Sequence, residues 1–284
     1  MEVYRDRAEG WQHAKLSGHI NENNVTEMIK NDLSTQERLI IAAGYSPSCI
    51  SVEKICVGGL NELNIPCILG DTTKNKTDVK ILLSNGKYIN ISIKKSLGGQ
   101  VYLITPERFI SGFQAIYNRP IPKNIKRAIE LFWGVADDIN DIIVRFPSGD
   151  SKIDAYQLRK RRLVERTLRI YDNKLCEELL EWFNNHMEYI FDFCFARGLA
   201  RDESESADLI WYINTLGENQ VDEIINIARV KENIPRNASY GTRGGGTTIQ
   251  LPFGFVQWHD PSKSSPCLQF HHGYEKIISL IEDL

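Results

Sequence analysis

The sequence predicts a mixed α/β protein whose core is a mixed β-sheet flanked by helices. Three observations support this fold class. An Asn-Gly turn joins two strongly alternating runs within 77–94, which is the strongest short-range signal for a β-hairpin. Helical periodicity dominates 123–230, and a second pair of strands is expected within 247–272. Strands and helices that mix in this order favour a sheet covered by helices over an all-helical or all-β fold.

The composition excludes several classes of protein. The chain has 284 residues and a formal net charge of −3, with 42% hydrophobic and 25% charged residues. These values are typical of a globular protein and exclude a largely disordered or polybasic chain. The charged N-terminal residues do not resemble a secretory signal, and no apolar stretch is long enough to span a membrane. Six scattered cysteines without a Cys-x-x-Cys pair indicate reduced thiols, so we expect a cytoplasmic protein.

The first elements are predicted by helical spacing and by capping residues. Apolar residues at helical spacing predict a helix over 20–43, ahead of the hairpin, and Ser34-Thr35 followed by Glu37 could restart a second turn within it. A third short strand is expected at 100–104, after the hairpin. Thr105 then provides an N-cap, followed by proline at the first helical position and an acid in the first turn. A helix is therefore expected to begin at Pro106.

The middle and the end of the chain differ in their patterns. Apolar periodicities predict helices through most of 123–230, including one or two helices over 208–230. A flexible glycine-rich loop is expected at 240–246. The segment 247–258 is interpreted as one strand with an internal bend, and 267–272 as the returning strand. A final amphipathic helix is expected to close the chain.

The predicted hairpin brings an acid and a lysine to its open end. A two-residue turn at Asn85 and Gly86 would place Asp78 roughly opposite position 93. Lys94 then lies at the same end, and Ser92 shares its face because strand side chains alternate with period two. A carboxylate at this place can hold Mg²⁺, which polarises a phosphate and lowers the pKa of bound water. The lysine can orient that water or stabilise charge on the phosphate.

This arrangement resembles a known family of nucleases. Asp78, followed on the next strand by a Ser-Ile-Lys sequence that ends at Lys94, resembles the core motif of the PD-(D/E)XK nucleases, which include most Type II restriction endonucleases. Two positions depart from the usual motif. Thr77 stands where proline is usual, and Ser92 stands where an acid is usual, and members of the family tolerate both changes. The resemblance covers about 14–117, with a weaker echo in the late glycine-rich hairpin.

The resemblance implies a restriction-endonuclease-like fold and Mg²⁺-dependent, sequence-specific cleavage of double-stranded DNA. Asp78 would bind the metal and Lys94 would position the attacking water, while Ser92 contributes room for water. In some members the missing acid comes from the helix after the third strand, so Glu107 is the expected substitute ligand, and Glu22 is a second candidate. The resemblance also implies a homodimer, because cutting both strands usually requires two active sites, and a cognate DNA methyltransferase.

On this interpretation the chain divides into three segments. The catalytic core would occupy 1–122, and a helical segment that grips DNA would occupy 123–235. The C-terminal hairpin and helix, 236–284, would recognise DNA and pack back on the core.

Several side chains are suited to DNA contact. Basic residues at helical spacing within 158–174 predict a phosphate-binding ridge, although a solvated helix face explains them equally well. In the C-terminal segment an arginine could contact guanine, glutamines could read adenine, and a glycine-rich loop could let the backbone approach DNA. Histidines and a lysine could contact phosphates. The candidate DNA-binding residues are His19, Gln100, Arg159, Arg162, Arg243, Gly245, Gln250, Gln257, His259 and Lys263.

Two alternative functions remain open from the sequence. One is a repair or nicking nuclease of the same fold. The other is a DNA-binding module with a degenerate nuclease site, which the serine at position 92 favours. Plain structural interpretations also exist for the candidate residues. Asp78 and Lys94 could each be ordinary strand residues, Glu107 could serve only the helix dipole, and Glu22 could be a surface glutamate.

Overall fold

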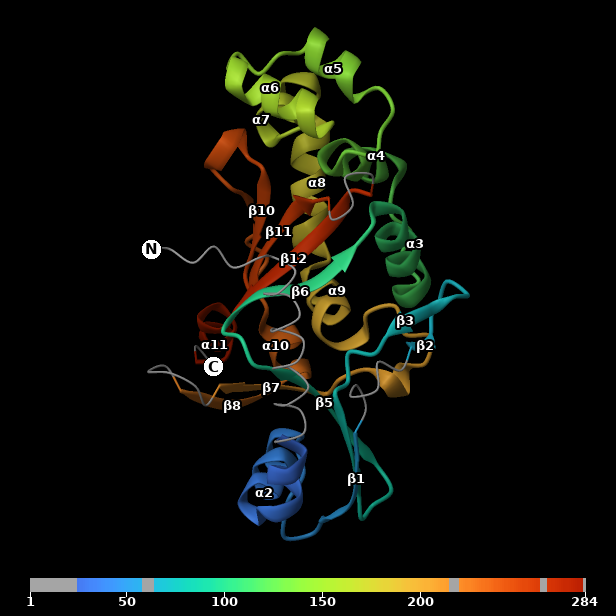
Figure 1. The fold of residues 1–284 in the computed structure, drawn as a ribbon, viewed down its shortest axis with the longest axis vertical. Helices are drawn as coiled ribbons and strands as arrows, with labels where there is room; N and C mark the ends of the chain where they lie inside the picture. The colour runs from blue at the N-terminus through green and yellow to red at the C-terminus, as the bar shows by residue number, and fades with distance from the viewer. Residues whose placement is uncertain (1–24, 58–63, 215–219, 261–264, 283–284) are drawn as a thin grey trace, which may run out of the picture. The chain divides into compact units, whose positions relative to one another are not determined.

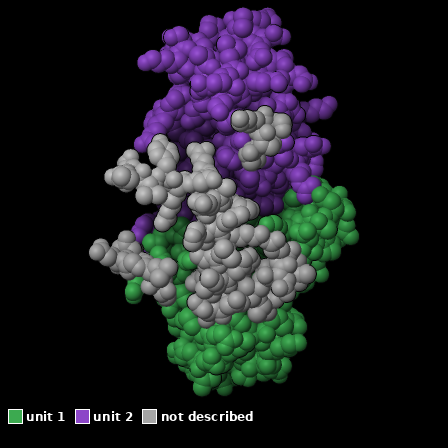
Figure 2. Space-filling model, in the orientation of Figure 1, with its two compact units in different colours: residues 1–97, 195–228 green, residues 98–194, 229–284 purple. Residues whose placement is uncertain are grey.

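A computed structural model (Figure 1) describes residues 25–57, 64–214, 220–260 and 265–282. The chain folds into two compact units, which comprise 1–97 with 195–228 and 98–194 with 229–284 (Figure 2). Each unit contains one sheet of five strands within the described residues. No described helix combines the length and the apolar character that crossing a membrane requires.

The first unit is built around a mixed sheet with the strand order β1-β4-β5-β7-β8. Its strands are β1 (Val52–Val57), β4 (Val79–Leu83), β5 (Tyr88–Lys94), β7 (Leu209–Asn214) and β8 (Val221–Asn226). The pair β5–β7 is parallel, and the other neighbouring strands are antiparallel. The unit also contains α2 (Leu33–Ala42), the short strands β2 (Asn64–Pro66) and β3 (Thr72–Lys74), and the 3-10 turn η2 (Glu203–Glu205).

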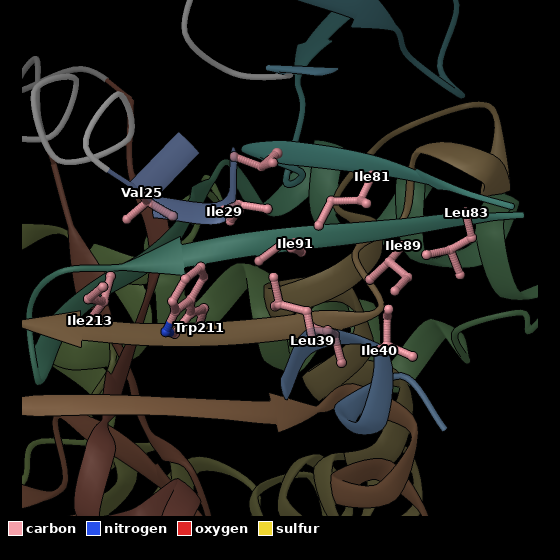
Figure 3. Packing of buried hydrophobic residues seen from close by; sticks show 12 residues of the cluster. Val25, Ile29, Leu39, Ile40, Ile81, Leu83, Ile89, Ile91, Trp211 and Ile213 are labelled. Carbon is pink, nitrogen blue, oxygen red and sulfur yellow. The ribbon is translucent and has the colours of Figure 1, made fainter. Parts of the chain in front are cut away.

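The core of this unit lies on one face of the sheet. Ile81 and Ile91 from the hairpin pack with Trp211 of β7 and with Leu39 of α2, and all four side chains are fully buried (Figure 3). Alternation along β4 and β5 sends the aliphatic side chains to this face. The opposite face of the same strands is therefore left to the polar residues that form the candidate site.

Two elements of this unit differ from the prediction. The predicted helix at 20–43 is interrupted at Asp32, whose carboxylate accepts hydrogen bonds from the N–H groups of Ser34 and Thr35 and so caps α2. The prediction of helices over 208–230 is wrong for most of that segment, which forms β7 and β8, and a helix, α10 (Ile227–Asn233), begins only at its end. The continuous apolar run of β7 is buried on both faces, and such a run cannot be distinguished from a buried helix by periodicity alone.

The second unit is built around an antiparallel sheet with the strand order β6-β12-β11-β10-β9. Its strands are β6 (Gly98–Ile104), β9 (Ser239–Tyr240), β10 (Thr248–Leu251), β11 (Gly254–His259) and β12 (Cys267–Gly273). Its helices include α3 (Pro106–Tyr117), α4 (Lys123–Trp133), α5 (Ile139–Arg145), α6 (Ser151–Lys160), α7 (Glu165–Tyr171), α8 (Asn173–Asn185), α9 (Met187–Asp192) and α11 (Tyr274–Glu282). A π-helical turn, η1 (Phe193–Arg197), and α10 (Ile227–Asn233) lie where the chain passes between the units. The predicted start of α3 is confirmed, with Thr105 as its N-cap.

The late β region is a three-stranded meander. The segment 247–258 was expected to be one bent strand, but it forms β10 and β11, which are joined by a tight turn at Pro252 and Phe253. Gly254 begins β11, and a Cβ at this position would collide with the backbone carbonyl of His271 on β12. The glycine therefore permits the close pairing of β11 with β12.

The predicted fold class is confirmed, since the protein combines a mixed sheet, flanking helices, a mostly helical middle and a late β region. The two compact units do not follow the three predicted segments. The reason lies in strand pairing between distant parts of the chain. β7 joins the first sheet beside β5, and β6 joins the second sheet beside β12.

Candidate active site

The β4–β5 hairpin positions the candidate acid and lysine. Its register places Asp78 opposite Ser92, one residue from the predicted position 93. The loop has three residues between the hydrogen-bonded Leu83 and Lys87, and it ends at Gly86 with φ +77°. A three-residue loop that ends in a left-handed glycine shifts the pairing by one residue relative to a two-residue Asn-Gly turn. The predicted meeting of the acid and the lysine at the open end is retained.

The carboxylate of Asp78 is held at the start of β4. The backbone N–H of Ile93 donates a hydrogen bond to Asp78 Oδ2 at 2.6 Å. The Ser92 side chain, on the residue opposite Asp78 in the register, also favours the charged carboxylate. Burial raises the pKa of Asp78, while the charge of Lys94 and the Ile93 hydrogen bond act in the opposite direction. A further positive charge close to this carboxylate would stabilise its ionised form.

Lys94 is held beside Ser92, the residue opposite Asp78. Lys94 Nζ donates to Ser92 Oγ at 2.7 Å and lies 3.5 Å from the carbonyl oxygen of Ile93. The Ser92 oxygen accepts from the ammonium group, so its own proton is available to the Asp78 carboxylate. Ser92 is fully buried, and Lys94 is half-buried. These three side chains gather on one face of the hairpin, with Ser92 between the acidic and the basic residue.

A turn outside the hairpin supports both strands, and the sequence did not indicate it. The buried Thr77 donates from Oγ1 to the carbonyl oxygen of Glu205 at 2.8 Å. The buried Asn90 donates from Nδ2 to the carbonyl oxygens of Ser204 and Ser206, each at 2.8 Å. Thr77 and Asn90 therefore tie this turn to the two strands of the hairpin. The signal for Asn90 was its place two residues before Ser92 on the same strand face.

The face extends beyond the hairpin onto β7 and β8. Lys94 pairs in parallel register with Tyr212, and Tyr212 pairs with the exposed Glu223. Cross-strand partners present their side chains on the same face of a sheet. Glu223 is therefore an acid on the site face, about 10 Å from Lys94 across two strand spacings. Sequence reasoning missed it because it assigned this segment to a helix.

None of the other predicted catalytic residues belongs to the described part of the first unit. Glu22 and His19 lie outside the described residues, as does Lys263. Glu107 belongs to the second unit, where it is exposed in the first turn of α3. The described residues contain no group of three or more His, Cys, Asp or Glu side chains that could hold a metal ion.

The donor set can nevertheless be tested against Mg²⁺. Asp78 provides a carboxylate whose burial is unfavourable for its charge, and the hydroxyl of Ser92 lies beside it. Mg²⁺ prefers oxygen ligands and commonly binds one or two protein carboxylates together with substrate phosphates and waters. These residues therefore fit a Mg²⁺ site that substrate phosphate and water complete, rather than a site made of protein ligands alone.

The predicted DNA-binding residues that the structure describes all lie in the second unit. Gln100 is on β6, which pairs with β12 in the second sheet and not with the hairpin. Gln250, Gln257 and His259 lie on β10 and β11. Arg159 and Arg243 are exposed. Gly245 packs so closely against Ile153 and Val164 that a Cβ would crowd both side chains, which gives this glycine a structural reason independent of DNA.

Arg162 corrects the prediction of a phosphate-contacting ridge. Its side chain is only 1% exposed, and its guanidinium lies 4.6 Å from the centre of the Phe132 ring. It donates to the carbonyl oxygen of Thr247 at 3.1 Å. Burial lowers the pKa of Arg162 to about 10, so the group remains charged at neutral pH. Arg162 therefore connects the segment before α7 to the loop before β10 inside the unit.

Comparison with known proteins gives a single kind of match. No family model matches the chain, and no curated protein shows significant sequence similarity to it. Among solved structures, the fold is similar to the restriction endonuclease MspI in complex with its cognate DNA. The two chains are 14% identical, the match covers 88% of this chain and 83% of that chain, and the TM-score is 0.48. The chemistry of the site itself must therefore carry any functional assignment.

Proposed function

We propose that this protein is a Mg²⁺-dependent endonuclease that hydrolyses phosphodiester bonds in double-stranded DNA with the sequence specificity of a Type II restriction endonuclease. The proposal is carried by the convergence of Lys94, Ser92 and Asp78 at the open end of the hairpin, where Lys94 Nζ donates to Ser92 Oγ at 2.7 Å and both residues favour the charged form of Asp78. The same residues form the sequence that resembles the PD-(D/E)XK motif. An ordinary solvated strand pair has no need for a buried serine between a half-buried acid and a lysine.

Each residue has a role in the proposed reaction. Lys94 would orient the attacking water and stabilise negative charge that develops on the phosphate. Ser92 would hold the ammonium group of Lys94 in place, because its hydroxyl oxygen accepts a hydrogen bond at 2.7 Å. Asp78 would hold the metal, and the Ile93 N–H would keep its carboxylate oriented. When bound there, Mg²⁺ would supply Lewis-acid polarisation of the scissile phosphate.

The proposal includes further groups that act with this site. Glu107 and Glu22 are the proposed additional metal ligands, as the family resemblance implies. A homodimer would provide two active sites for the two DNA strands. The enzyme would act in the cytoplasm, and a cognate methyltransferase would protect the DNA of the same cell from cleavage.

A plasmid digest tests the proposal directly. The purified chain is incubated with supercoiled plasmid and Mg²⁺, and a matched control contains EDTA. We expect discrete fragments in the presence of Mg²⁺ and no cleavage in the presence of EDTA. Nicked circles without double-strand breaks would instead favour the nicking nuclease. DNA binding without any cleavage would favour the module with a degenerate site. Neither binding nor cleavage would contradict all three functions.

Binding is also expected to weaken steeply as salt increases. The segment 159–169 carries six basic residues and one acid, and Arg159 and Arg166 are exposed. Each phosphate contact releases condensed counterions, so contact with about four phosphates gives a slope near −3.6 for log affinity against log salt. Fluorescence anisotropy with a labelled duplex between 50 and 200 mM salt measures this slope. A flat profile would argue against DNA as the substrate.

A further inference from the structure

A row of amide side chains crosses the second sheet from strand to strand. Gln257 on β11 donates from Nε2 to Gln269 Oε1 on β12 at 2.8 Å. Gln269 in turn donates from Nε2 to Gln100 Oε1 on β6 at 2.7 Å. His271 joins the row, since its Nε2 lies 3.2 Å from Gln257 Nε2. These four residues are defined as the amide row.

The amide row occupies the face of the sheet that is turned away from the core. Val256, Leu268 and Phe270, which alternate with the amide-row residues on β11 and β12, are all fully buried. The amide-row residues on these strands are partly exposed, and Gln100 is exposed. A polar face is ordinary for an antiparallel sheet. A connected series of three glutamines across three strands is a more specific feature, because lysine, glutamate and threonine would serve equally well as solvated surface.

The amide row has the hydrogen-bonding capacity of a base-reading surface. Among the described residues, Gln257 Oε1 accepts no hydrogen bond and Gln100 Nε2 donates none, so both ends of the row offer groups to a ligand. Gln257 Nε2 is a donor, so His271 Nε2 is the acceptor and the His271 proton lies on Nδ1. Burial lowers the pKa of His271, which favours the neutral ring. Phe255 stacks on that ring with 4.4 Å between centroids and so fixes its orientation.

The dimensions of the amide row match those of stacked base pairs. Neighbouring strands lie about 4.8 Å apart, so the row from β11 to β6 spans about 10 Å. Base pairs in a duplex are spaced about 3.4 Å apart, so this span covers about three steps. A duplex whose axis runs across the strands would therefore present successive base edges to the row.

Positive charge lies at the end of the strands where a phosphate backbone would then pass. The Gly246 carbonyl, just before β10, accepts from the N–H of Glu165 at the start of α7. At the same end of the sheet, Lys160 Nζ lies 5.0 Å from the centre of the Trp258 ring on β11. Two hollows with a basic excess open here. One is lined by Arg159, Lys160 and Arg161 together with Asp137 and Asp260, and the other by Arg166 and Arg169 together with Glu165.

We propose that the amide row contacts base edges of double-stranded DNA and determines sequence selectivity, with a preference for A·T pairs at the contacted positions. Gln100 can match adenine N7 and N6 in the major groove with its Nε2 donor and the second lone pair of its Oε1, while Gln257 offers its Oε1 to the N6 amino group. The exposed arginines of α6 and α7 provide phosphate contacts at the side. This inference rests on the proposed function, since it assumes that double-stranded DNA is the substrate. Gln269 is a new assignment, and its signal in the sequence was its alternation with apolar residues on one strand.

The test is selection of binding sites from a library of random duplexes with the full-length chain in EDTA, which prevents cleavage. The wild-type protein is expected to enrich a motif that contains A·T pairs. Gln257→Leu and Gln269→Leu keep the side-chain size but remove the hydrogen bonds. Each variant should lose the preference at one or two positions and bind the selected site about 10- to 100-fold more weakly. Affinity for unrelated duplexes should stay within about twofold, which also shows that the variants are folded.

Two controls separate base contacts from other effects. Gln36→Leu removes an amide on α2 in the first unit, and this variant should enrich the wild-type motif. Arg166→Ala should keep the motif and reduce the salt slope by about one. Identical motifs and affinities for the wild type and both sheet variants would overturn the inference. Binding and cleavage by the wild type without any enriched motif would overturn it together with the proposed sequence specificity, while leaving Mg²⁺-dependent cleavage of DNA intact. Absence of both binding and cleavage would refute the nuclease itself.

Discussion

Replacing Lys94 with alanine is expected to reduce the rate of DNA cleavage by about 10²- to 10³-fold, the usual cost of removing a group that stabilises transition-state charge. Lys94 Nζ lies 2.7 Å from Ser92 Oγ, so the ammonium group is already oriented before substrate binds. DNA affinity should change by less than about twofold, since most phosphate contacts are proposed for other cations. Single-turnover cleavage of a plasmid, together with binding in EDTA, measures both quantities.

The same hairpin offers a matched control. Lys87 lies at the opposite end of the hairpin from the site, beside the ring of Tyr45, and Lys87→Ala removes the same charge. This variant should cleave at the wild-type rate. If Lys94→Ala also cleaves at the wild-type rate, the assignment of the active site is wrong. Equal losses in both variants would show that removal of positive charge from the hairpin, and not the position of Lys94, causes the effect.

Replacing Asp78 with asparagine is expected to abolish cleavage and to make the protein more stable at neutral pH. Burial raises the pKa of Asp78, so the folded protein binds this proton more tightly than the unfolded chain does. The contribution of Asp78 to stability is therefore greatest below its ordinary pKa of about 4 and is lost as pH rises through the raised pKa. Asparagine has no charge to bury and keeps an oxygen for the Ile93 N–H.

Thermal unfolding at two pH values tests this expectation. Asp78→Asn should gain about 1 kcal/mol at pH 7, in the range typical of relieved strain at an active site, and the gain should shrink towards pH 4. Asp32→Asn is the control, because hydrogen bonds from Thr35 and Ser34 lower the pKa of that carboxylate, and this variant should gain nothing at pH 7. An Asp78→Asn protein that is less stable than the wild type at pH 7 would contradict the inference that the buried charge of Asp78 lowers the stability of the folded protein.

The accuracy of the sequence predictions followed the range of the interactions involved. Thr105 capped α3 as expected, because an N-cap bonds within its own turn. The hairpin formed as expected, but its register differed by one residue because Gly86 closes a three-residue loop. The segment of β7 was assigned to a helix, since only its pairing with β5, more than a hundred residues away in sequence, makes it a strand.

The candidate site shows the same division. Ser92 and Lys94 share a strand face by the two-residue period alone, so their proximity could be read from the sequence. The support from Thr77 and Asn90 could not be read, because both bond to a turn more than a hundred residues away. The sequence also could not show which arginines are exposed, and Arg162 is buried.

The sequence by itself determined the α/β class, the hairpin and the meeting of Asp78 with Lys94. These features depend on alternation, turn residues and caps, which act over a few residues. The tertiary structure decided which distant strands complete each sheet, which basic side chains remain exposed, and how glutamines from three strands join in one row. These features depend on pairing between distant segments, where burial of apolar faces selects one partner among many and local patterns are silent.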